Sequence, residues 1–246
     1  MLSLKIYYDF HIHSCLSPCG DDEMTPNNLV NMAQLAGLNA IALTDHNTCG
    51  NCAAAATVAE ELGMIFLPGM ELCTAEEAHV VCLFPNIEAA EHFEAQIAPT
   101  LPPIQNRPEI FGEQILCDTE DRQVGTKDIL LTTASAISVD GVAKLARSCG
   151  GTAFPAHIDR PSYSVTAALG DLPPLGFAAI EITKNGNVEE LSCRYAEIVG
   201  KPLLQNSDAH HLEDIQDAGP YLDLPDSSPE TIIAALNGEI PFTWQR

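Results

Sequence analysis

Histidine and carboxylate side chains recur in this sequence directly after short apolar segments. Six of the eight histidines lie in such places: His11, His13, His46, His79, His157 and His210. Carboxylates lie within or beside the same short motifs: Asp9, Asp45, Glu71 and Asp208. Imidazole nitrogens combined with carboxylate oxygens suit zinc, iron or manganese, whereas calcium and magnesium prefer oxygen ligands alone. The residue types therefore predict a site for divalent metal ions.

Two pairs of these residues have the spacing that a strand requires for joint binding. His11 and His13 are separated by one residue, and so are Asp208 and His210. Residues i and i+2 of a strand point to the same side, so each pair could bind one ion together. Glu71 could bridge two ions through its two oxygens. The spacing predicts a centre that binds more than one ion.

Short strands alternate with helical segments along most of the chain, and these elements must position the histidines. The expected strands are 5–10, 40–44, 65–68, 80–84, 152–156, 179–182 and 202–206, and the expected helices begin near residues 25, 51, 138, 187 and 228. Such alternation predicts a mainly parallel sheet. Seven units favour a closed or nearly closed barrel, with an open doubly wound sheet as the alternative. Barrel enzymes carry their active-site groups at the carboxyl ends of the strands, which is where the histidines are expected.

The segment 85–135 interrupts the alternation. It contains a proline-rich stretch followed by two short strand-like runs around a polar turn. We expect an insertion with a helix and a hairpin, placed beside or over the active face. The whole chain, 1–246, is expected to form one domain.

Composition limits the partners and the compartment. With 11 basic and 34 acidic residues, the formal net charge is −23. A surface of this sign repels phosphate, so long nucleic acid is expected to be a poor partner unless bound metals supply positive charge. No apolar run is long enough to span a membrane, and the N-terminus lacks signal-peptide features, so no membrane association is expected. Nine cysteines, mostly in apolar or helical surroundings, favour a reducing cytoplasm.

Four cysteines lie in two loops that are expected to be neighbours. Cys15 and Cys19 follow the first strand, and Cys49 and Cys52 follow the second. A zinc site of four thiolates or a redox pair is conceivable. Reduced thiols that pack the loops are the preferred interpretation.

The motifs HIH, TDH, PGMEL, AHVV, FPAH and SDAH, in this order, resemble the polymerase and histidinol phosphatase (PHP) family. The resemblance extends from Tyr8 to about His210. Amidohydrolase barrels also begin with H-x-H, but they typically add a metal-bridging lysine, and no lysine here occupies a suitable strand end. The resemblance implies a distorted, TIM-like (β/α)7 barrel that binds two to three divalent ions (Zn, Mn or Fe).

The resemblance also implies which residues bind each ion. The first ion would be bound by His11, His13, Glu71 and Asp208, the second by Glu71, His79 and His157, and the third by His46, His210 and a residue of the loop after His13. In that loop Pro18 occupies the position at which many members have an aspartate. Asp21 or Asp22 would therefore have to reach the third ion, and Asp21 is slightly preferred because it follows the flexible Gly20.

The expected activity is that of a metal-dependent phosphoric ester hydrolase acting on a small phosphorylated metabolite or nucleotide. Clustered ions would generate a bridging hydroxide that attacks phosphorus, and they would hold the oxygens of the displacement. Asp45 is expected to orient a metal-bound histidine, and Asp9 could do the same. Arg160 is the first candidate to bind phosphate and Lys184 the second.

Three other functions stay open at this point. They are a short-oligonucleotide exonuclease, a non-catalytic metal-binding or regulatory domain, and a hydrolase of a non-phosphate ester or amide. The sequence leaves the exact substrate, the native metal and the oligomeric state undetermined.

Overall fold

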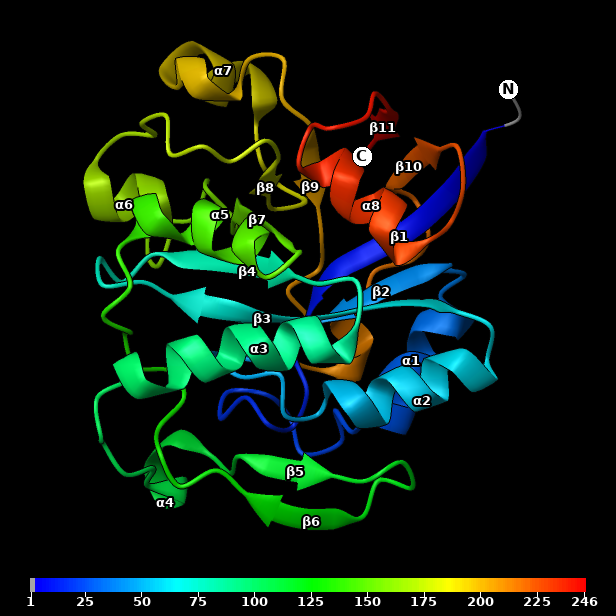
Figure 1. Ribbon diagram of the computed structural model, residues 1–246, viewed down its shortest axis with the longest axis vertical. Helices are drawn as coiled ribbons and strands as arrows, with labels where there is room; N and C mark the ends of the chain where they lie inside the picture. Colours follow the sequence, from blue (N-terminus) through cyan, green and yellow to red (C-terminus); the bar gives the residue numbers. More distant parts are fainter. Residues whose placement is uncertain (1–2) are drawn as a thin grey trace.

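A curled sheet of seven strands, in the order β11-β10-β1-β2-β3-β4-β7, forms the centre of the computed structural model, which describes residues 3–246 (Figure 1). Its strands are β1 (Leu4–Ile12), β2 (Ala40–Leu43), β3 (Ile65–Cys73), β4 (His79–Leu83), β7 (Thr152–Pro155), β10 (Tyr221–Leu224) and β11 (Thr243–Gln245). Two pairs lie apart from it: the hairpin of β5 (Ile115–Cys117) and β6 (Gln123–Thr126), and the parallel pair β8 (Ile180–Ile182) and β9 (Leu203–Gln205). All seven strands expected from the sequence are present.

The α/β class is confirmed, but a closed (β/α)7 barrel is not. In the large sheet only β1, β2 and β3 pair in parallel. The pairs β3–β4, β4–β7, β1–β10 and β10–β11 are antiparallel. The turn between β3 and β4 is too short for the crossover that a parallel pair needs. Within residues 3–246, β8 and β9 pair only with each other, so the sheet stays open.

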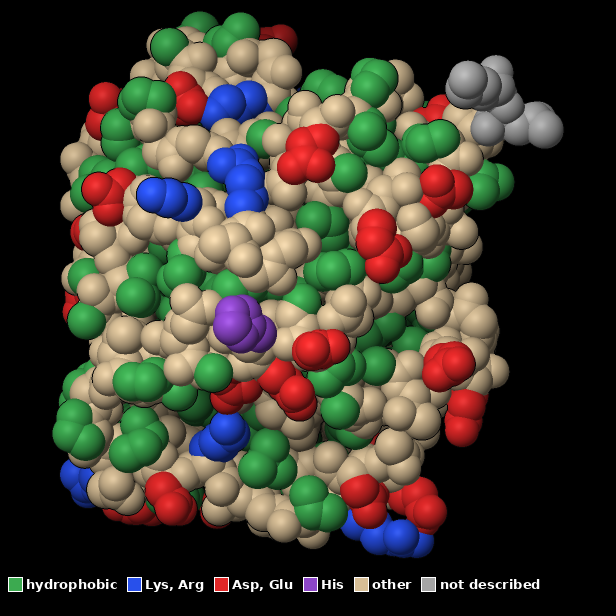
Figure 2. All heavy atoms as spheres, viewed as in Figure 1, with side chains coloured by type: hydrophobic (Ala, Val, Ile, Leu, Met, Phe, Trp, Pro, Cys, Tyr) green, Lys and Arg blue, Asp and Glu red, His purple; other side chains and the backbone are tan. Residues whose placement is uncertain are grey.

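Helices cover the sheet, and the five helices expected from the sequence are among them. The α-helices are α1 (Pro26–Leu35), α2 (Cys52–Glu61), α3 (Ile87–Ile97), α4 (Pro108–Phe111), α5 (Val139–Ser148), α6 (Val165–Leu169), α7 (Val188–Arg194) and α8 (Pro229–Leu236). Short 3₁₀ turns are η1 (Ala98–Thr100), η2 (Ala196–Ile198) and η3 (Leu212–Asp214). None of the helices in residues 3–246 is both long enough and apolar enough to cross a bilayer. On the face of the molecule drawn in Figure 2, apolar side chains are scattered among polar and charged ones.

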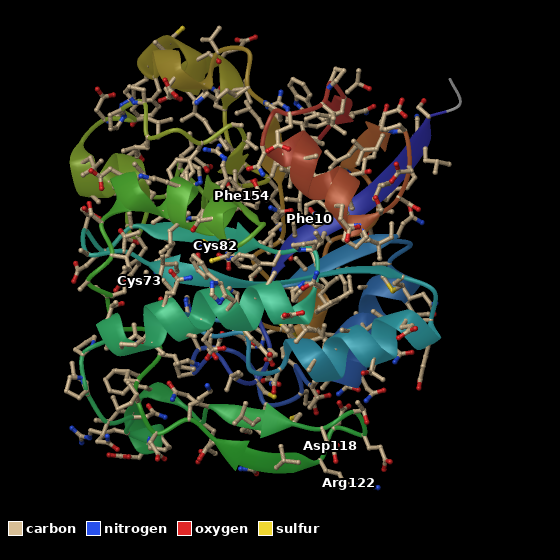
Figure 3. All side chains as sticks on the ribbon, viewed as in Figure 1. Phe10, Cys73, Cys82, Asp118, Arg122 and Phe154 are labelled. Carbon is tan, nitrogen blue, oxygen red and sulfur yellow. The ribbon has the colours of Figure 1, made fainter. Side chains whose placement is uncertain are left out.

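Two apolar clusters hold these layers together. One cluster lies between the sheet and helices α1, α2, α3 and α5. The other packs the opposite side chains of the strands against α8, and it includes Phe10 of β1 and Phe154 of β7 (Figure 3). If a strand shifted by one residue, its side chains would exchange between the two faces of the sheet. Burial in these clusters therefore fixes where each strand ends.

The segment 85–135, which was expected to be an insertion, contains helix α3 followed by the β5–β6 hairpin, the two features predicted for it. Asp118 and Arg122 lie at the turn of the hairpin, on the side away from the sheet (Figure 3). The opposite end of the hairpin contacts the loop after β1, where the Ile115 N–H donates to the Cys15 carbonyl at 3.0 Å. The insertion therefore packs on the loop that follows the two histidines of β1.

Strand β3 changes partners halfway along its length. Residues 65–68 pair with β2, and residues 69–73 pair with β4. Gly69 marks the change, since a Cβ atom there would collide with the carbonyl oxygen of Cys82. The change of partner places Glu71 between the end of β2 and the start of β4, where the histidines meet.

Candidate metal centre

Glu71 lies at the centre of the histidine cluster and is buried. Its Oε1 lies 2.8 Å from Nδ1 of His79 and 3.2 Å from Nε2 of His157. Its Oε2 lies 3.0 Å from Nδ1 of His46 and 3.5 Å from Nε2 of His13. Burial alone would raise the pKa of Glu71, but the neighbouring histidines hold it well below its ordinary value. The two oxygens face different histidines, which is the arrangement that a bridging carboxylate needs.

The pair His11 and His13 points to one spot, as the i, i+2 spacing predicts. Their Nε2 atoms are 3.2 Å apart. Asp208 Oδ1 lies 3.3 Å from Nε2 of His11 and 3.2 Å from Nε2 of His13. The segment that carries Asp208 runs beside the end of β1, where the His13 N–H donates to the Ala209 carbonyl at 3.0 Å. His11, His13 and Asp208 thus form one group of possible ligands.

His79 reaches the cluster from the beginning of a strand, whereas the other expected positions lie near or after the carboxyl ends of strands. It is the first residue of β4, which runs antiparallel to β3. The start of β4 therefore lies at the same edge of the sheet as the ends of β1 and β2. His46, Glu71 and His79 form a second group of possible ligands.

A third group consists of histidines alone. Possible ligand atoms of His13, His46 and His210 lie within 4.8 Å of one another. The rings of His13 and His210 are stacked, with centroids 4.2 Å apart. Burial and the neighbouring His210 lower the pKa of His13 well below its ordinary value, which keeps its imidazole neutral and able to bind a metal.

Neither Asp21 nor Asp22, which were expected to complete this third group, is brought into it by the structure. The Asp21 Oδ1 accepts from the Glu23 N–H at 2.9 Å, its Oδ2 lies 3.7 Å from Nδ1 of His211, and 44% of its side chain is exposed. Asp22 is exposed as well. The reason is the backbone: the Asp21 N–H donates to the His210 carbonyl at 2.9 Å, while its carboxylate caps the turn to Glu23.

Cys19 is the loop residue that faces His46 and His210. Partial loss of hydration would raise the pKa of its thiol, but hydrogen bonding to the two imidazoles lowers the pKa to about 6. No sequence motif indicated this, because the position follows Pro18 in a loop whose length differs from the family pattern.

Asp45 supports the centre through a serine. It accepts from the Ser14 N–H at 2.7 Å, from the Ser14 hydroxyl at 2.6 Å and from the Ser17 hydroxyl at 2.7 Å. Ser17 Oγ lies 2.9 Å from Nδ1 of His13. Because the Ser17 hydroxyl donates to Asp45, its oxygen can accept a hydrogen bond from the Nδ1–H of His13, which leaves Nε2 free for a metal. Asp45 thus orients His13 rather than the adjacent His46.

Glu181 of β8 was not found by sequence reasoning. Its Oε2 lies 3.0 Å from Nδ1 of His11 and accepts from Nδ2 of Asn206 at 2.7 Å, while its Oε1 accepts from the His157 N–H at 2.9 Å. The available signal was a single acidic residue within the apolar strand segment AAIEI. It fulfils for His11 the role that was expected of Asp9.

Asp9 instead binds backbone groups. It accepts from the N–H of His11 at 3.3 Å and of Ser207 at 3.1 Å. Burial raises the pKa of Asp9 to about 6, although these hydrogen bonds oppose the rise. Asp9 therefore fastens the segment before Asp208 to β1.

The two basic residues singled out from the sequence differ in position. Arg160 lies at the centre, with Nη1 2.6 Å from Oδ2 of Asp208 and 43% of its side chain exposed. Lys184 is exposed and lines a separate hollow with Gln205 and Arg246. Among the described residues, the structure thus brings only Arg160 of this pair to the histidine cluster.

The four cysteines considered for a zinc site are dispersed. Cys15 Sγ lies 3.6 Å from Sγ of Cys117. Cys49 Sγ lies 2.9 Å from Oε2 of Glu94, and Cys52 is buried against the carbonyl oxygens of residues 43 and 69. The positions of Cys15, Cys49 and Cys52 agree with free thiols that pack the loops, whereas Cys19 is exposed.

The residues at the centre fit divalent ions. Three buried atoms, His46 Nδ1, His157 Nδ1 and Asp208 Oδ1, have no hydrogen-bond partner within residues 3–246. Buried polar atoms without a partner are costly, and they are rare unless an ion or water completes them. His157 and Asp208 also have left-handed backbones, with φ of 30° and 54°, which are uncommon for residues other than glycine and gather at functional sites.

A cavity of about 490 Å³ opens beside Arg160. Its wall includes Asp159, Asn187, Arg194 and Tyr195. The guanidinium of Arg194 lies over the ring of Tyr195, 5.1 Å from its centroid. The cavity therefore adjoins the metal centre through a residue that also contacts Asp208.

Comparisons with known proteins agree with this geometry. The family model for the PHP domain matches residues 9–124, which confirms the resemblance seen in the sequence motifs. Endonuclease Q from Pyrococcus furiosus shares the fold, with a TM-score of 0.69 and 18% identity over 98% of this chain and 58% of the endonuclease chain. A Bifidobacterium adolescentis protein assigned as a metal-dependent phosphoesterase has a TM-score of 0.61 and 19% identity over 93% of this chain and 95% of that one.

A 5'-3' exoribonuclease from Haemophilus influenzae is 37% identical over 79 residues, which are 31% of this chain and 28% of the exoribonuclease. This chain thus spans less than two thirds of the length of the exoribonuclease and of endonuclease Q.

One expectation about partners is wrong. Endonuclease Q is also known in complex with a 27-mer duplex substrate that has an abasic lesion at the active site, and that structure has a TM-score of 0.69 to this chain. The same fold therefore accommodates long nucleic acid, so a net charge of −23 does not exclude such a partner. The argument from net charge failed because the field at a site depends on the groups and ions there, not on the total charge.

Proposed function

We propose that this chain, whose residues 9–124 match the PHP domain family, hydrolyses phosphoester bonds in nucleotides or at the ends of nucleic acid chains with two to three divalent ions. The observation that carries the proposal is the position of Glu71, whose two oxygens face separate groups of histidines. A carboxylate between two such groups suits neighbouring ions, the arrangement used by many enzymes that cleave phosphoesters.

Divalent ions at this centre would lower the pKa of a bound water and neutralise charge on the phosphate. The protein's part is to present neutral imidazole nitrogens in fixed directions. Glu181 and Ser17 do this by accepting from the Nδ1 atoms of His11 and His13. Burial excludes competing water, since both histidines are fully buried.

Arg160 is placed to bind a phosphate oxygen beside Asp208. Its guanidinium contacts Asp208, and Arg160 also lines the adjacent cavity. A guanidinium can bind phosphate with two parallel hydrogen bonds, which orients the ester as well as attracting it. The cavity beyond Arg160, with Arg194 and Tyr195, would receive a nucleoside or the next nucleotide of a chain.

The test is a panel of substrates given to protein depleted of metal and then loaded with manganese, zinc or iron. The panel contains nucleoside monophosphates and bisphosphates, short 5'-phosphorylated RNA and DNA, and duplex DNA with and without an abasic site. We expect turnover of at least one nucleotide or nucleic acid substrate. Binding of metal without turnover of any of them would favour a non-catalytic metal-binding domain.

Arg160→Ala and Lys184→Ala form a matched pair for the phosphate-binding role. We expect Arg160→Ala to lower kcat/KM by on the order of 10- to 100-fold, the loss of one charge-assisted interaction of about 1.5–3 kcal/mol. Lys184→Ala should leave kcat/KM unchanged, since Lys184 lines a different hollow. Equal losses in the two variants would contradict the role of Arg160.

A further inference from the structure

The third group of histidines lacks a charged ligand of the usual kind. The other two groups of possible ligands each include a carboxylate, Asp208 in one and Glu71 in the other. The group of His13, His46 and His210 contains imidazoles alone. The two aspartates of the neighbouring loop do not complete it, because Asp21 caps its own turn and Asp22 is exposed.

Cys19 lies where that ligand is missing. Its thiol is within hydrogen-bonding reach of the imidazoles of both His46 and His210. His46 is buried, and its Nδ1, 3.0 Å from Oε2 of Glu71, has no hydrogen-bond partner within residues 3–246. A buried imidazole with an unpartnered nitrogen is an independent sign that an ion belongs beside His46.

The backbone around Cys19 is held on both sides. Before it, Pro18 is buried, and a Cβ atom at Gly112 of the insertion would collide with the Pro18 carbonyl oxygen. After it, Gly20 donates to the Ser17 carbonyl at 2.8 Å, and a Cβ atom on Gly20 would come within 2.5 Å of the Ser14 carbonyl oxygen. The thiol is thus presented by a fixed turn that the insertion buttresses.

We propose that Cys19 is a thiolate ligand of a divalent ion bound by His46 and His210, in the place where a carboxylate was expected. Thiolate together with imidazole favours zinc or ferrous iron over manganese or magnesium, which prefer oxygen. The third site should therefore have a different metal preference from the sites built around Glu71. This inference rests on the metal centre and does not depend on which ester the protein hydrolyses.

Cobalt substitution provides the test, because a thiolate bound to Co²⁺ gives a charge-transfer absorption in the near ultraviolet that imidazole and carboxylate ligands do not give. We expect this band in the cobalt-loaded wild type and its loss in Cys19→Ser, together with the loss of one ion per chain. Cys19→Asp should recover the ion without the band. Asp21→Ala should keep both. A band that survives in Cys19→Ser, or loss of an ion in Asp21→Ala alone, would overturn the proposal.

Alkylation of the unmodified protein gives a readout that needs no variant. Cys19 and Cys193 are both exposed, so Cys193 is an internal control. We expect zinc to protect Cys19 from iodoacetamide, measured by peptide mass spectrometry, while Cys193 reacts equally with and without zinc. Equal reaction of Cys19 in the zinc-loaded and the metal-depleted protein would contradict the proposal.

Discussion

The direction of each imidazole is set by the group that accepts from its outer nitrogen. Glu181 accepts from Nδ1 of His11 and also from the backbone of His157, so one buried carboxylate orients two candidate ligands. Asp45 acts on His13 through the Ser17 hydroxyl. Because these contacts fix which nitrogen carries the proton, they determine the affinity of the centre as much as the ligands do.

Replacing Glu181 with glutamine should weaken metal binding without unfolding the protein. The amide keeps the volume of the side chain but offers one acceptor atom in place of two, so His11 or the His157 N–H loses its partner. We expect the affinity for zinc or manganese to fall by about 10- to 100-fold in a calorimetric titration. The control is Glu189→Gln, an exposed position. Wild-type affinity in Glu181→Gln would show that His11 needs no such acceptor.

The sequence was sufficient to predict the residues whose chemistry is evident from their type and spacing. The ten residues proposed as ligands included eight that the structure brings together; Asp21 and Asp22 lie apart from them, with the Asp21 carboxylate accepting from the Glu23 N–H. Glu181 and Cys19 were missed for a related reason. Their roles depend on where β8 and the loop after β1 lie in space, and neither has a local sequence signature.

The packing of strand β3 at Gly69 helps to set the position of Glu71. Gly69→Ala would place a Cβ atom against the Cys82 carbonyl oxygen, so β3 or β4 would have to shift, and Glu71 with it. We expect the free energy of unfolding to fall by about 1–3 kcal/mol, as for overpacked cores, and metal affinity to fall too. Denaturant unfolding and metal titration measure the two effects.

Gly141 of α5 is the matched control for this change. A Cβ atom there would have nothing within 4 Å, and the residue lies within a helix. Gly141→Ala should therefore stabilise the protein by about 0.5–1 kcal/mol and leave metal affinity unchanged. A Gly69→Ala protein as stable as the Gly141→Ala protein would contradict the account of β3.

Helix α5 is capped by a residue from the β3–β4 turn. Glu76 Oε2 accepts from the Val139 N–H at 2.9 Å, and Oε1 accepts from the Ser138 hydroxyl at 2.5 Å. Burial opposes ionisation, but these hydrogen bonds lower the pKa of Glu76 below its ordinary value of 4.5. A carboxyl group with a lowered pKa stabilises the folded state above its unfolded pKa, and this stabilisation is lost as the pH falls through the folded pKa.

Glu76→Ala should therefore be destabilising at neutral pH by about 1 kcal/mol or less, the usual effect of removing a helix cap at a largely exposed site. The difference from wild type should shrink as the pH is lowered below 4.5, where the wild-type carboxyl also becomes protonated. Chemical denaturation at several pH values measures this. A difference that grows toward acid pH would be inconsistent with the cap.

The elements themselves were largely predictable, and their pairing was not. Apolar runs and helix starts located seven strands and five helices, because periodicity is a local property. The direction of β4 depends on the short turn that precedes it, and β10 was missed although its residues YLDL alternate in burial. Pairing of β10 with β1 joins residues more than 200 positions apart, such as Leu4 and Leu224, and no local pattern reveals such a contact.

For the whole molecule, metal binding should be coupled to stability and to pH. Without bound ions, the buried histidines and carboxylates repel one another or lack hydrogen-bond partners. A saturating concentration of metal should therefore raise the melting temperature. At a free metal concentration 100 times the Kd the gain is about 2.7 kcal/mol. The gain should shrink as the pH falls, because protons compete with the metal for the imidazole nitrogens. Scanning calorimetry with and without a chelator measures both effects. Equal melting temperatures at neutral pH would contradict the coupling.

The net negative charge of the whole chain does not by itself decide whether phosphate or nucleic acid can bind. It sets the average field around the molecule, but each divalent ion adds two positive charges at the place where phosphate would bind. Arg160 adds another, and Arg194 also lines the adjoining cavity. Binding of nucleic acid should consequently depend on metal and weaken with salt.

The most direct test of the account is hydrolysis by the wild type and by Glu71→Gln, each first depleted of metal and then loaded with manganese or zinc. The readout is the release of phosphate or mononucleotide from nucleoside phosphates and short 5'-phosphorylated oligonucleotides. We predict that metal restores turnover to the wild type and not to a folded Glu71→Gln protein. Turnover that is equally fast in the chelated wild type, or in Glu71→Gln, would contradict the account.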